Sequence, residues 1–118
     1  MSHLIETLSV AQPGGYRDVS PTDVVRAGYH GRVIDVREPG EFTGELGHML
    51  RAELVPLSTL GAVAASWNQE QPILLVCRSG ARSARAAQFL AGLGFRKLYN
   101  LAGGMLAHQA AGLPVSRS

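Results

Sequence analysis

The sequence of 118 residues has little cysteine and little lysine, since Cys77 and Lys97 are the only residues of their kinds. A single cysteine excludes an intramolecular disulfide and any zinc site built from several cysteines. The four histidines, at positions 3, 30, 48 and 108, lack the spacing of metal ligands. We therefore expect neither a metal nor a cofactor.

Long apolar runs are also missing. No segment approaches the roughly 20 apolar residues that cross a bilayer. The N-terminus has no basic region, and it carries Glu6 where a signal peptide has an apolar run. We expect a cytoplasmic protein without a membrane partner, in a compartment that keeps a lone thiol reduced.

Positive charge is present but neither dense nor clustered. The formal net charge is only +2, and the cations, nearly all arginines, are scattered along the chain. No stretch is typical of a basic tail or an arginine-rich helix face. We therefore do not expect a nucleic acid as a partner.

Turn-forming residues at Gln12–Gly15 divide the chain into an N-terminal leader segment, residues 1–15, and one domain, residues 16–118. Strands are expected at 16–19, 32–36, 53–55, 73–76 and 97–99. Helices are expected at 21–27, 58–67, before Gly94 and at 105–111, with at most two helical turns within 38–45. Trp67 and Phe89 lie on apolar helix faces and are expected in the core. This alternation predicts an α/β domain with three layers and a mostly parallel sheet.

The longest continuous apolar strand, Ile73–Val76, ends directly at Cys77. A strand without alternation is typical of the centre of a parallel sheet, because both of its faces are buried. Ligands in open α/β sheets bind beyond the carboxyl ends of the strands. Cys77 is therefore placed where chemistry is expected.

The segment after Cys77 runs Arg78, Ser79, Gly80, Ala81, Arg82, Ser83 and leads into a helix. Gly80 allows the backbone to curl, so that successive N–H groups converge on one point at a helix N-terminus. These donors, with the two arginines, are expected to lower the pKa of the thiol and to favour a nucleophilic thiolate. The alternative, a small buried apolar cysteine, fits poorly with such polar neighbours.

Four segments resemble the rhodanese family of sulfurtransferases, in the family's order. They are the loop Cys77–Ser83, the segment Val33–Phe42, the turn Gly47-His48 with Ala52, and Asn100–Gly104 with Gly112–Pro114. Two departures stand out: Leu50-Arg51 replaces a usual Pro-Gly, and His108 stands where the family often has tryptophan. The first puts the shape of that turn in doubt, and the second affects helix packing or the wall of the site.

The resemblance implies a five-stranded, mostly parallel sheet with helices on both faces. It also implies a double-displacement reaction through a Cys77 persulfide. The donor would be a small sulfur-containing anion such as thiosulfate, and the acceptor cyanide, a thiol or a protein. Backbone groups of Arg78–Ser83 would surround the transferred sulfur.

Four further residues are expected to have structural roles near the loop. Asp35, Arg37 and Glu41 are expected to form ion pairs and hydrogen bonds rather than to act as acids or bases, because a preformed thiolate needs none. His48 is expected to satisfy backbone groups in its turn.

Two other functions stay open. A phosphatase or arsenate reductase of related design needs an arginine after five intervening residues to clamp two oxygens, but that position is Ser83, and Arg82 comes one residue early. A sulfur relay or docking module for a partner protein is the other alternative, and the intact loop with its cysteine argues against docking alone.

Overall fold

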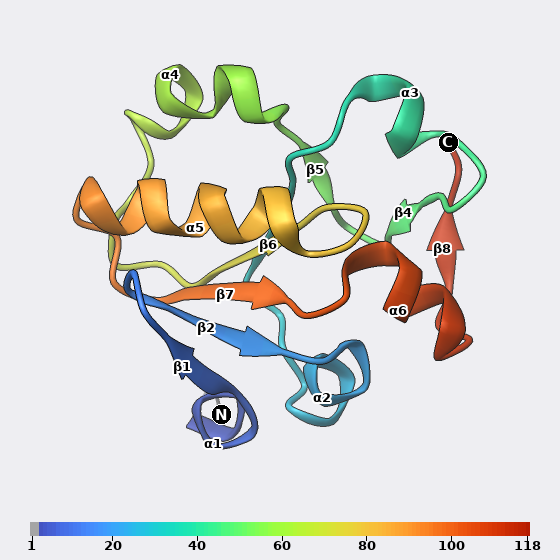
Figure 1. The fold of residues 1–118 in the computed structure, drawn as a ribbon, viewed down its shortest axis with the longest axis horizontal. Coiled ribbons are helices and arrows are strands. Elements are labelled where there is room, and N and C mark those ends of the chain that lie inside the picture. The colour runs from blue at the N-terminus through green and yellow to red at the C-terminus, as the bar shows by residue number, and fades with distance from the viewer. Residues whose placement is uncertain (1–2) are drawn as a thin grey trace.

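The computed structural model describes residues 3–118, built around a six-stranded sheet (Figure 1). Its spatial order is β1 (Val10–Gln12), β2 (Tyr16–Val19), β7 (Leu98–Leu101), β6 (Ile73–Val76), β3 (Arg32–Asp35) and β5 (Glu53–Leu54). The five strands β2, β7, β6, β3 and β5 are all parallel to one another. Strand β1 at the edge is the only strand of this sheet that is antiparallel to its neighbour. The mostly parallel sheet expected from the alternating pattern is confirmed.

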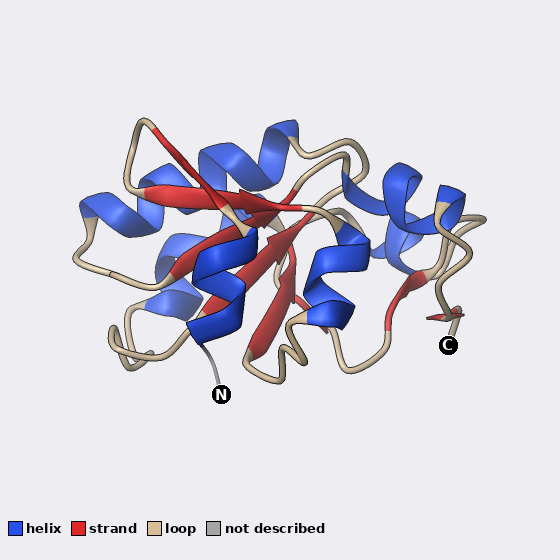
Figure 2. Ribbon diagram, turned by 90° about the horizontal axis from the view of Figure 1, so that it is seen from below, coloured by secondary structure: helices blue, strands red, loops and turns tan. Residues whose placement is uncertain are grey.

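Helices cover both faces of this sheet, as Figure 2 shows. One face packs against α4 (Leu60–Ala64) and α5 (Ala81–Gly92), and the other against α1 (His3–Leu8), α2 (Pro21–Arg26) and α6 (Gly104–Ala110). A short 3-10 turn, η1 (Leu57–Thr59), precedes α4, and α3 (Pro39–Phe42) follows β3. The three expected layers are therefore present.

The central strand β6 supplies side chains to both cores. Ile73, Leu75 and Cys77 face the α4–α5 layer, whereas Leu74 and Val76 face the α1–α2–α6 layer. All of them are almost completely buried. Burial on both faces is the reason that this strand is apolar throughout.

The N-terminal segment joins the domain. Residues 3–12, part of the expected leader, form α1 and β1, and Ile5 of α1 is buried in the core. Met1 and Ser2, the first two residues of that leader, lie outside the described residues. Because β1 pairs with β2, the main sheet has six strands rather than five. A three-residue strand at a sheet edge has too little periodicity to be found in the sequence.

Two smaller features also differ from expectation. A separate two-stranded sheet joins β4 (His48–Met49) to β8 (Val115–Ser116). Phe89, expected in the core, is 47% exposed, and its ring lies close to Gly61 of α4. Trp67 is partly buried and meets Phe95 edge-on. Among residues 3–118, no helix has the length and apolar character needed to cross a membrane.

Candidate active site

Cys77 lies at the carboxyl end of β6, as its position in the sequence predicted. Strands β2 and β7 point toward the same side of the molecule, where α3 and α6 lie (Figure 1). The Cys77 residue is only 1% exposed, and the chain turns through Ser79 and Gly80 into α5. Gly80 has a φ of 103°, in the left-handed region that favours glycine. The expected curl of the backbone after the cysteine is present.

Three hydrogen-bond donors converge on the Cys77 sulfur. The Gly80 N–H lies 3.1 Å from Sγ, and the N–H and hydroxyl of Ser83 each lie 3.3 Å from it. Burial raises the pKa of the Cys77 thiol, but these hydrogen bonds, with one from the Ser79 backbone, oppose it more strongly. The net effect lowers the pKa, because the donors stabilise the thiolate more than burial disfavours it.

Helix α6 is hydrogen-bonded to the start of the Cys77 loop. The N–H groups of Met105 and Leu106 donate to the carbonyl oxygens of Cys77 and Arg78, at 2.9 and 3.0 Å. A Cβ at Gly104 would lie 2.5 Å from each of those oxygens. Glycine at this position therefore allows α6 to approach the loop, and α6 supplies the donors for these two loop carbonyls.

Asn100 of β7 is a residue of this site whose individual role was not predicted from the sequence. It is buried, its amide donates to Asp18 Oδ1 at 3.0 Å and to the Gly80 carbonyl at 3.2 Å, and its own carbonyl accepts from the Ser83 hydroxyl. One signal could have found it. An amide in a strand whose neighbours are buried needs partners, because an unpaired buried amide is costly.

Arg82 and Glu41 form a bidentate ion pair, with both N–O distances 2.8 Å. The hydrogen bonds from Arg82 hold the pKa of Glu41 at about 2, below its usual value of 4.5. The pair connects α5 to α3, and each side chain is about one-third exposed. The Arg82 guanidinium, one of the two expected to favour the thiolate, is therefore already paired with a carboxylate.

Asp35 and Arg37 form a second ion pair that is completely buried. The guanidinium donates to both carboxylate oxygens, at 2.9 and 2.8 Å, and its Nη2 also donates to the Gly47 carbonyl at 2.7 Å. The pair thus connects the end of β3 to the turn before β4.

Histidines 48 and 108 are both engaged with backbone carbonyls. His48 Nδ1 donates to the Phe42 carbonyl at 2.7 Å, and its ring stacks on Phe42 at 3.6 Å between centroids. His108 Nε2 lies 3.0 Å from the Pro114 carbonyl, while its Nδ1 has no partner among the described residues. The other departure from the family pattern is exposed: Leu50 faces solvent, and Arg51 has a φ of 68°.

Arg78 and Ser79 are the exposed part of the loop, together with Ala81. Within the described part of the chain, no partner is recorded for the Arg78 guanidinium. The structure therefore brings Cys77, Gly80 and Ser83 together at the sulfur, whereas Arg82 turns to Glu41 and Arg78 faces solvent. In residues 3–118, no three His, Cys, Asp or Glu side chains are grouped as metal ligands.

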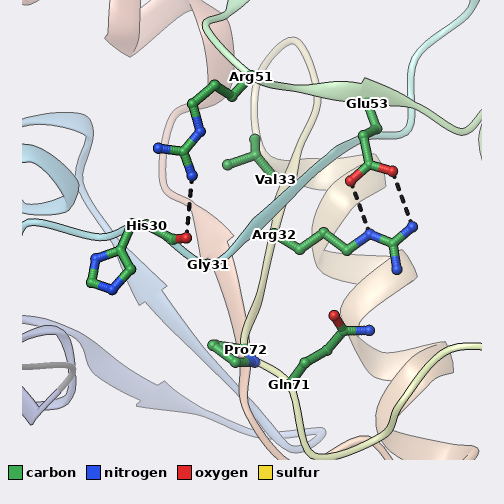
Figure 3. A pocket seen from close by; sticks show the side chains of 8 residues that line it. All are labelled: His30, Gly31, Arg32, Val33, Arg51, Glu53, Gln71 and Pro72. Carbon is green, nitrogen blue, oxygen red and sulfur yellow. Dashed lines mark hydrogen bonds and ion pairs between the residues drawn. The ribbon is translucent and has the colours of Figure 1, made fainter.

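Two surface cavities lie at the other end of the strands. One, of about 430 Å³, is shown in Figure 3 and includes Arg32, Arg51 and Glu53 in its lining. Arg32 forms a bidentate pair with Glu53, and Arg51 donates to the His30 carbonyl. The second, of about 600 Å³, is lined by α1 and by the start of β7. Neither is lined by residues of the Cys77 loop.

Comparisons with known proteins agree with this geometry. The sequence profile of the Rhodanese-like domain matches residues 21–111. A rhodanese-related protein from Thermoplasma volcanium has a TM-score of 0.77 and 28% identity, covering 87% of this chain and all of that one. A rhodanese-like domain protein from Staphylococcus aureus has a TM-score of 0.72 and 25% identity, covering 84% and 97%.

Curated relatives include the uncharacterized protein YqhL of Bacillus subtilis, 46% identical over 80 residues, which are 67% of this chain and 62% of YqhL. An uncharacterized Synechocystis protein is 38% identical over 73% of this chain and 47% of its own length, so this chain spans about half or somewhat more of these two relatives. The thiosulfate sulfurtransferase GlpE of Vibrio cholerae is 29% identical over 86% of this chain and 93% of GlpE.

The family profile covers the strand that ends at Cys77, the loop around its sulfur and all of α6, which contacts that loop. The resemblance inferred from four short segments is confirmed. The chain belongs to the rhodanese-like domain family.

Proposed function

We propose that this protein is a sulfurtransferase that carries sulfane sulfur on Cys77 as a persulfide. The observation that carries the proposal is the convergence of the Gly80 N–H, the Ser83 N–H and the Ser83 hydroxyl on Sγ. Such a set of donors favours the thiolate, which is the nucleophilic form of cysteine. The proposal places the protein in the cytoplasm, where a lone thiol stays reduced between turnovers.

The first half-reaction loads the cysteine. The Cys77 thiolate attacks the outer sulfur of thiosulfate, a new S–S bond forms, and the old S–S bond breaks with its electron pair leaving on sulfite. The product is Cys77–S–S⁻, so the charge has moved one atom outward. No external oxidant or reductant is needed, because the donor already carries sulfur in the transferable state.

The second half-reaction removes the outer sulfur from the Cys77 persulfide. Cyanide, a thiolate or the thiolate of an acceptor protein attacks the outer sulfur, and Cys77 leaves as the thiolate. The hydrogen-bond donors around Sγ stabilise the negative charge of the Cys77 thiolate. They therefore favour the thiolate both as the nucleophile of the first half-reaction and as the leaving group of the second. Neither half-reaction requires a general acid or base, in keeping with the structural positions of Asp35, Arg37 and His48.

Anion recruitment in this proposal rests on Arg78 and on the start of α5. The N-terminus of this 12-residue helix adds positive potential beside the sulfur. Arg78 is exposed and free to meet a dianion, whereas the charge of Arg82 is balanced by Glu41. Arg82 would then act on thiosulfate indirectly, by holding α3 beside the loop.

Phosphoryl chemistry is disfavoured by the position of Ser83. A phosphatase loop of this kind needs an arginine there to clamp two phosphate oxygens. Here Ser83 is completely buried and directs its hydroxyl at Sγ and Asn100. The bidentate pairing of Arg82 with Glu41 occupies the nearest alternative guanidinium.

The experiment is intact mass after incubation with thiosulfate, followed by addition of cyanide or a thiol. A gain of one sulfur atom, about 32 Da on the only thiol of the chain, that disappears with the acceptor supports the proposal. Cys77→Ser is the control and should gain nothing. No gain with thiosulfate or with a small persulfide donor overturns the proposal and favours a docking module.

A further inference from the structure

The orientation of the Asn100 side chain follows from its partners. The Gly80 carbonyl can only accept a hydrogen bond, and so can an ionised Asp18 carboxylate. Both contacts therefore require the NH₂ group of Asn100, which leaves its carbonyl facing Ser83. Asp18 lies directly opposite Asn100 in the β2–β7 register, so the strand pairing itself holds this arrangement.

Ser83 then has two acceptors for one proton. Its hydroxyl lies within hydrogen-bond distance of both the Asn100 carbonyl and Cys77 Sγ. A serine hydroxyl carries a single hydrogen, so it donates to only one of them at a time. All three residues are buried, so bulk water scarcely offers these atoms alternative hydrogen-bond partners.

We propose that Asn100 is a positioning residue that competes with Cys77 for the hydroxyl proton of Ser83. While Cys77 is a neutral thiol, the hydroxyl donates to the Asn100 carbonyl, and the S–H can donate to Ser83 Oγ. When Cys77 becomes a thiolate, the hydroxyl turns to Sγ, because hydrogen bonds to a charged acceptor are about twice as strong as neutral ones. Asn100 thus sets how readily the thiolate forms.

The same competition extends to the sulfur cycle, and this step rests on the proposed function. In Cys77–S–S⁻ the charge lies on the outer sulfur, so Sγ no longer needs the hydroxyl as a donor. The Ser83 hydroxyl then turns back and donates to the Asn100 carbonyl. When an acceptor removes the outer sulfur, charge returns to Sγ and the hydroxyl turns back. The Ser83 hydroxyl therefore donates to Sγ whenever Sγ carries the charge, and it donates to the Asn100 carbonyl while the charge lies on the outer sulfur.

The direct test removes the competing acceptor. In Asn100→Val the hydroxyl has no other partner, so the thiolate-to-thiol ratio at a fixed pH below the midpoint should rise about threefold to tenfold, the range of one ordinary hydrogen bond. The readout is the ultraviolet absorbance of the thiolate against pH, with Cys77→Ser as the blank. A single cysteine makes this signal unambiguous.

The same substitution made in a Ser83→Ala variant distinguishes competition for the hydroxyl from a general loosening of the loop. In Ser83→Ala there is no proton to share, so adding Asn100→Val should no longer raise the thiolate fraction. An equal change in both backgrounds, or a decrease in the presence of Ser83, overturns the proposal. Circular dichroism establishes that each variant is folded.

A measurement on the unaltered sequence keeps the test decisive if Asn100→Val fails to fold. The side-chain amide resonances of Asn100, followed by NMR against pH, should move with the same midpoint as Cys77. Most of that movement should vanish in Ser83→Ala. Amide resonances that ignore the Cys77 titration overturn the proposal. Neither readout uses a sulfur donor, so a protein that titrates as expected but gains no sulfur contradicts only the proposed function.

Discussion

Arg82 of α5 and Glu41 of α3 form a bidentate ion pair beside Cys77, with both N–O distances 2.8 Å. The two residues are 41 positions apart in the sequence, so the pair joins elements that are distant along the chain. It also balances the charge of one of the two arginines in the loop, so that Arg78 remains as the exposed cation. Of the two loop arginines, Arg82 therefore connects α5 to α3, and Arg78 is the one available to an incoming anion.

The Arg82–Glu41 pair should make stability depend on pH. We expect Glu41→Gln to lower the free energy of unfolding by about 0.5–1 kcal/mol near neutral pH, because a partly exposed pair is screened by solvent. The folded-state pKa of Glu41 is lowered from 4.5 to about 2. The contribution is therefore complete above the unfolded value, and it is lost as the pH falls toward the folded one.

Urea unfolding of both proteins at several pH values between neutral and about 2 measures this difference. The gap between them should close as the pH falls. Glu70→Gln is the matched control, since Glu70 is exposed and no ion pair of its side chain is recorded in the described chain. A gap that stays constant with pH would contradict the assignment of the lowered pKa to this pair.

Cys77→Ser should abolish sulfur transfer and leave the fold intact. Serine has nearly the same shape and can accept the hydrogen bonds of Gly80 and Ser83, so the free energy of unfolding should change by no more than about 1 kcal/mol. A serine hydroxyl stays protonated and cannot form the persulfide. The mass assay and thermal unfolding measure the two effects, and a variant that unfolds would mean that Cys77 acts mainly as a core residue.

Gly104→Ala should destabilise the protein by about 2–4 kcal/mol, because a Cβ costs energy at positive φ and clashes with its neighbours. The φ of Gly104 is 58°, and the added Cβ would lie 2.5 Å from the carbonyl oxygens of Cys77 and Arg78. Gly92→Ala is the control, since nothing lies within 4 Å of its Cβ position and its φ is not in the left-handed region. Alanine there should be neutral or stabilise by up to about 1 kcal/mol. Equal effects of the two substitutions would contradict the close approach of α6 to the loop.

Arg78→Ala should raise the KM for thiosulfate several-fold and leave kcat nearly unchanged. The side chain is exposed, and it acts on the approach of the dianion rather than on the sulfur that reacts. Steady-state kinetics at two salt concentrations measure this, and added salt should weaken the unaltered protein more than the variant. Arg96→Ala is the control, because Arg96 lines the cavity at the opposite end of the strands. A fall in kcat alone would show that Arg78 does not act in recruiting the anion.

The sequence by itself determined the centre of this protein. The unbroken apolar strand Ile73–Val76 requires burial on both faces, and this places Cys77 at the carboxyl end of a parallel sheet. Gly80 and the helix that follows require a curled loop whose N–H groups converge. These inferences depend on neighbours in the chain, where propensity and periodicity carry the information.

Only the tertiary structure decided how distant side chains are paired. The sequence predicted a role for Arg82 in the loop and an ion pair for Glu41, and folding brings α3 beside α5 so that these two residues pair with each other. Asn100 reaches Ser83 because β7 lies between β2 and β6. The short strand β1 gains its stability from pairing with β2 and from Ile5 packing into the core. Local sequence patterns do not carry these contacts, because the energy of a buried polar group depends on partners that only the folded chain supplies.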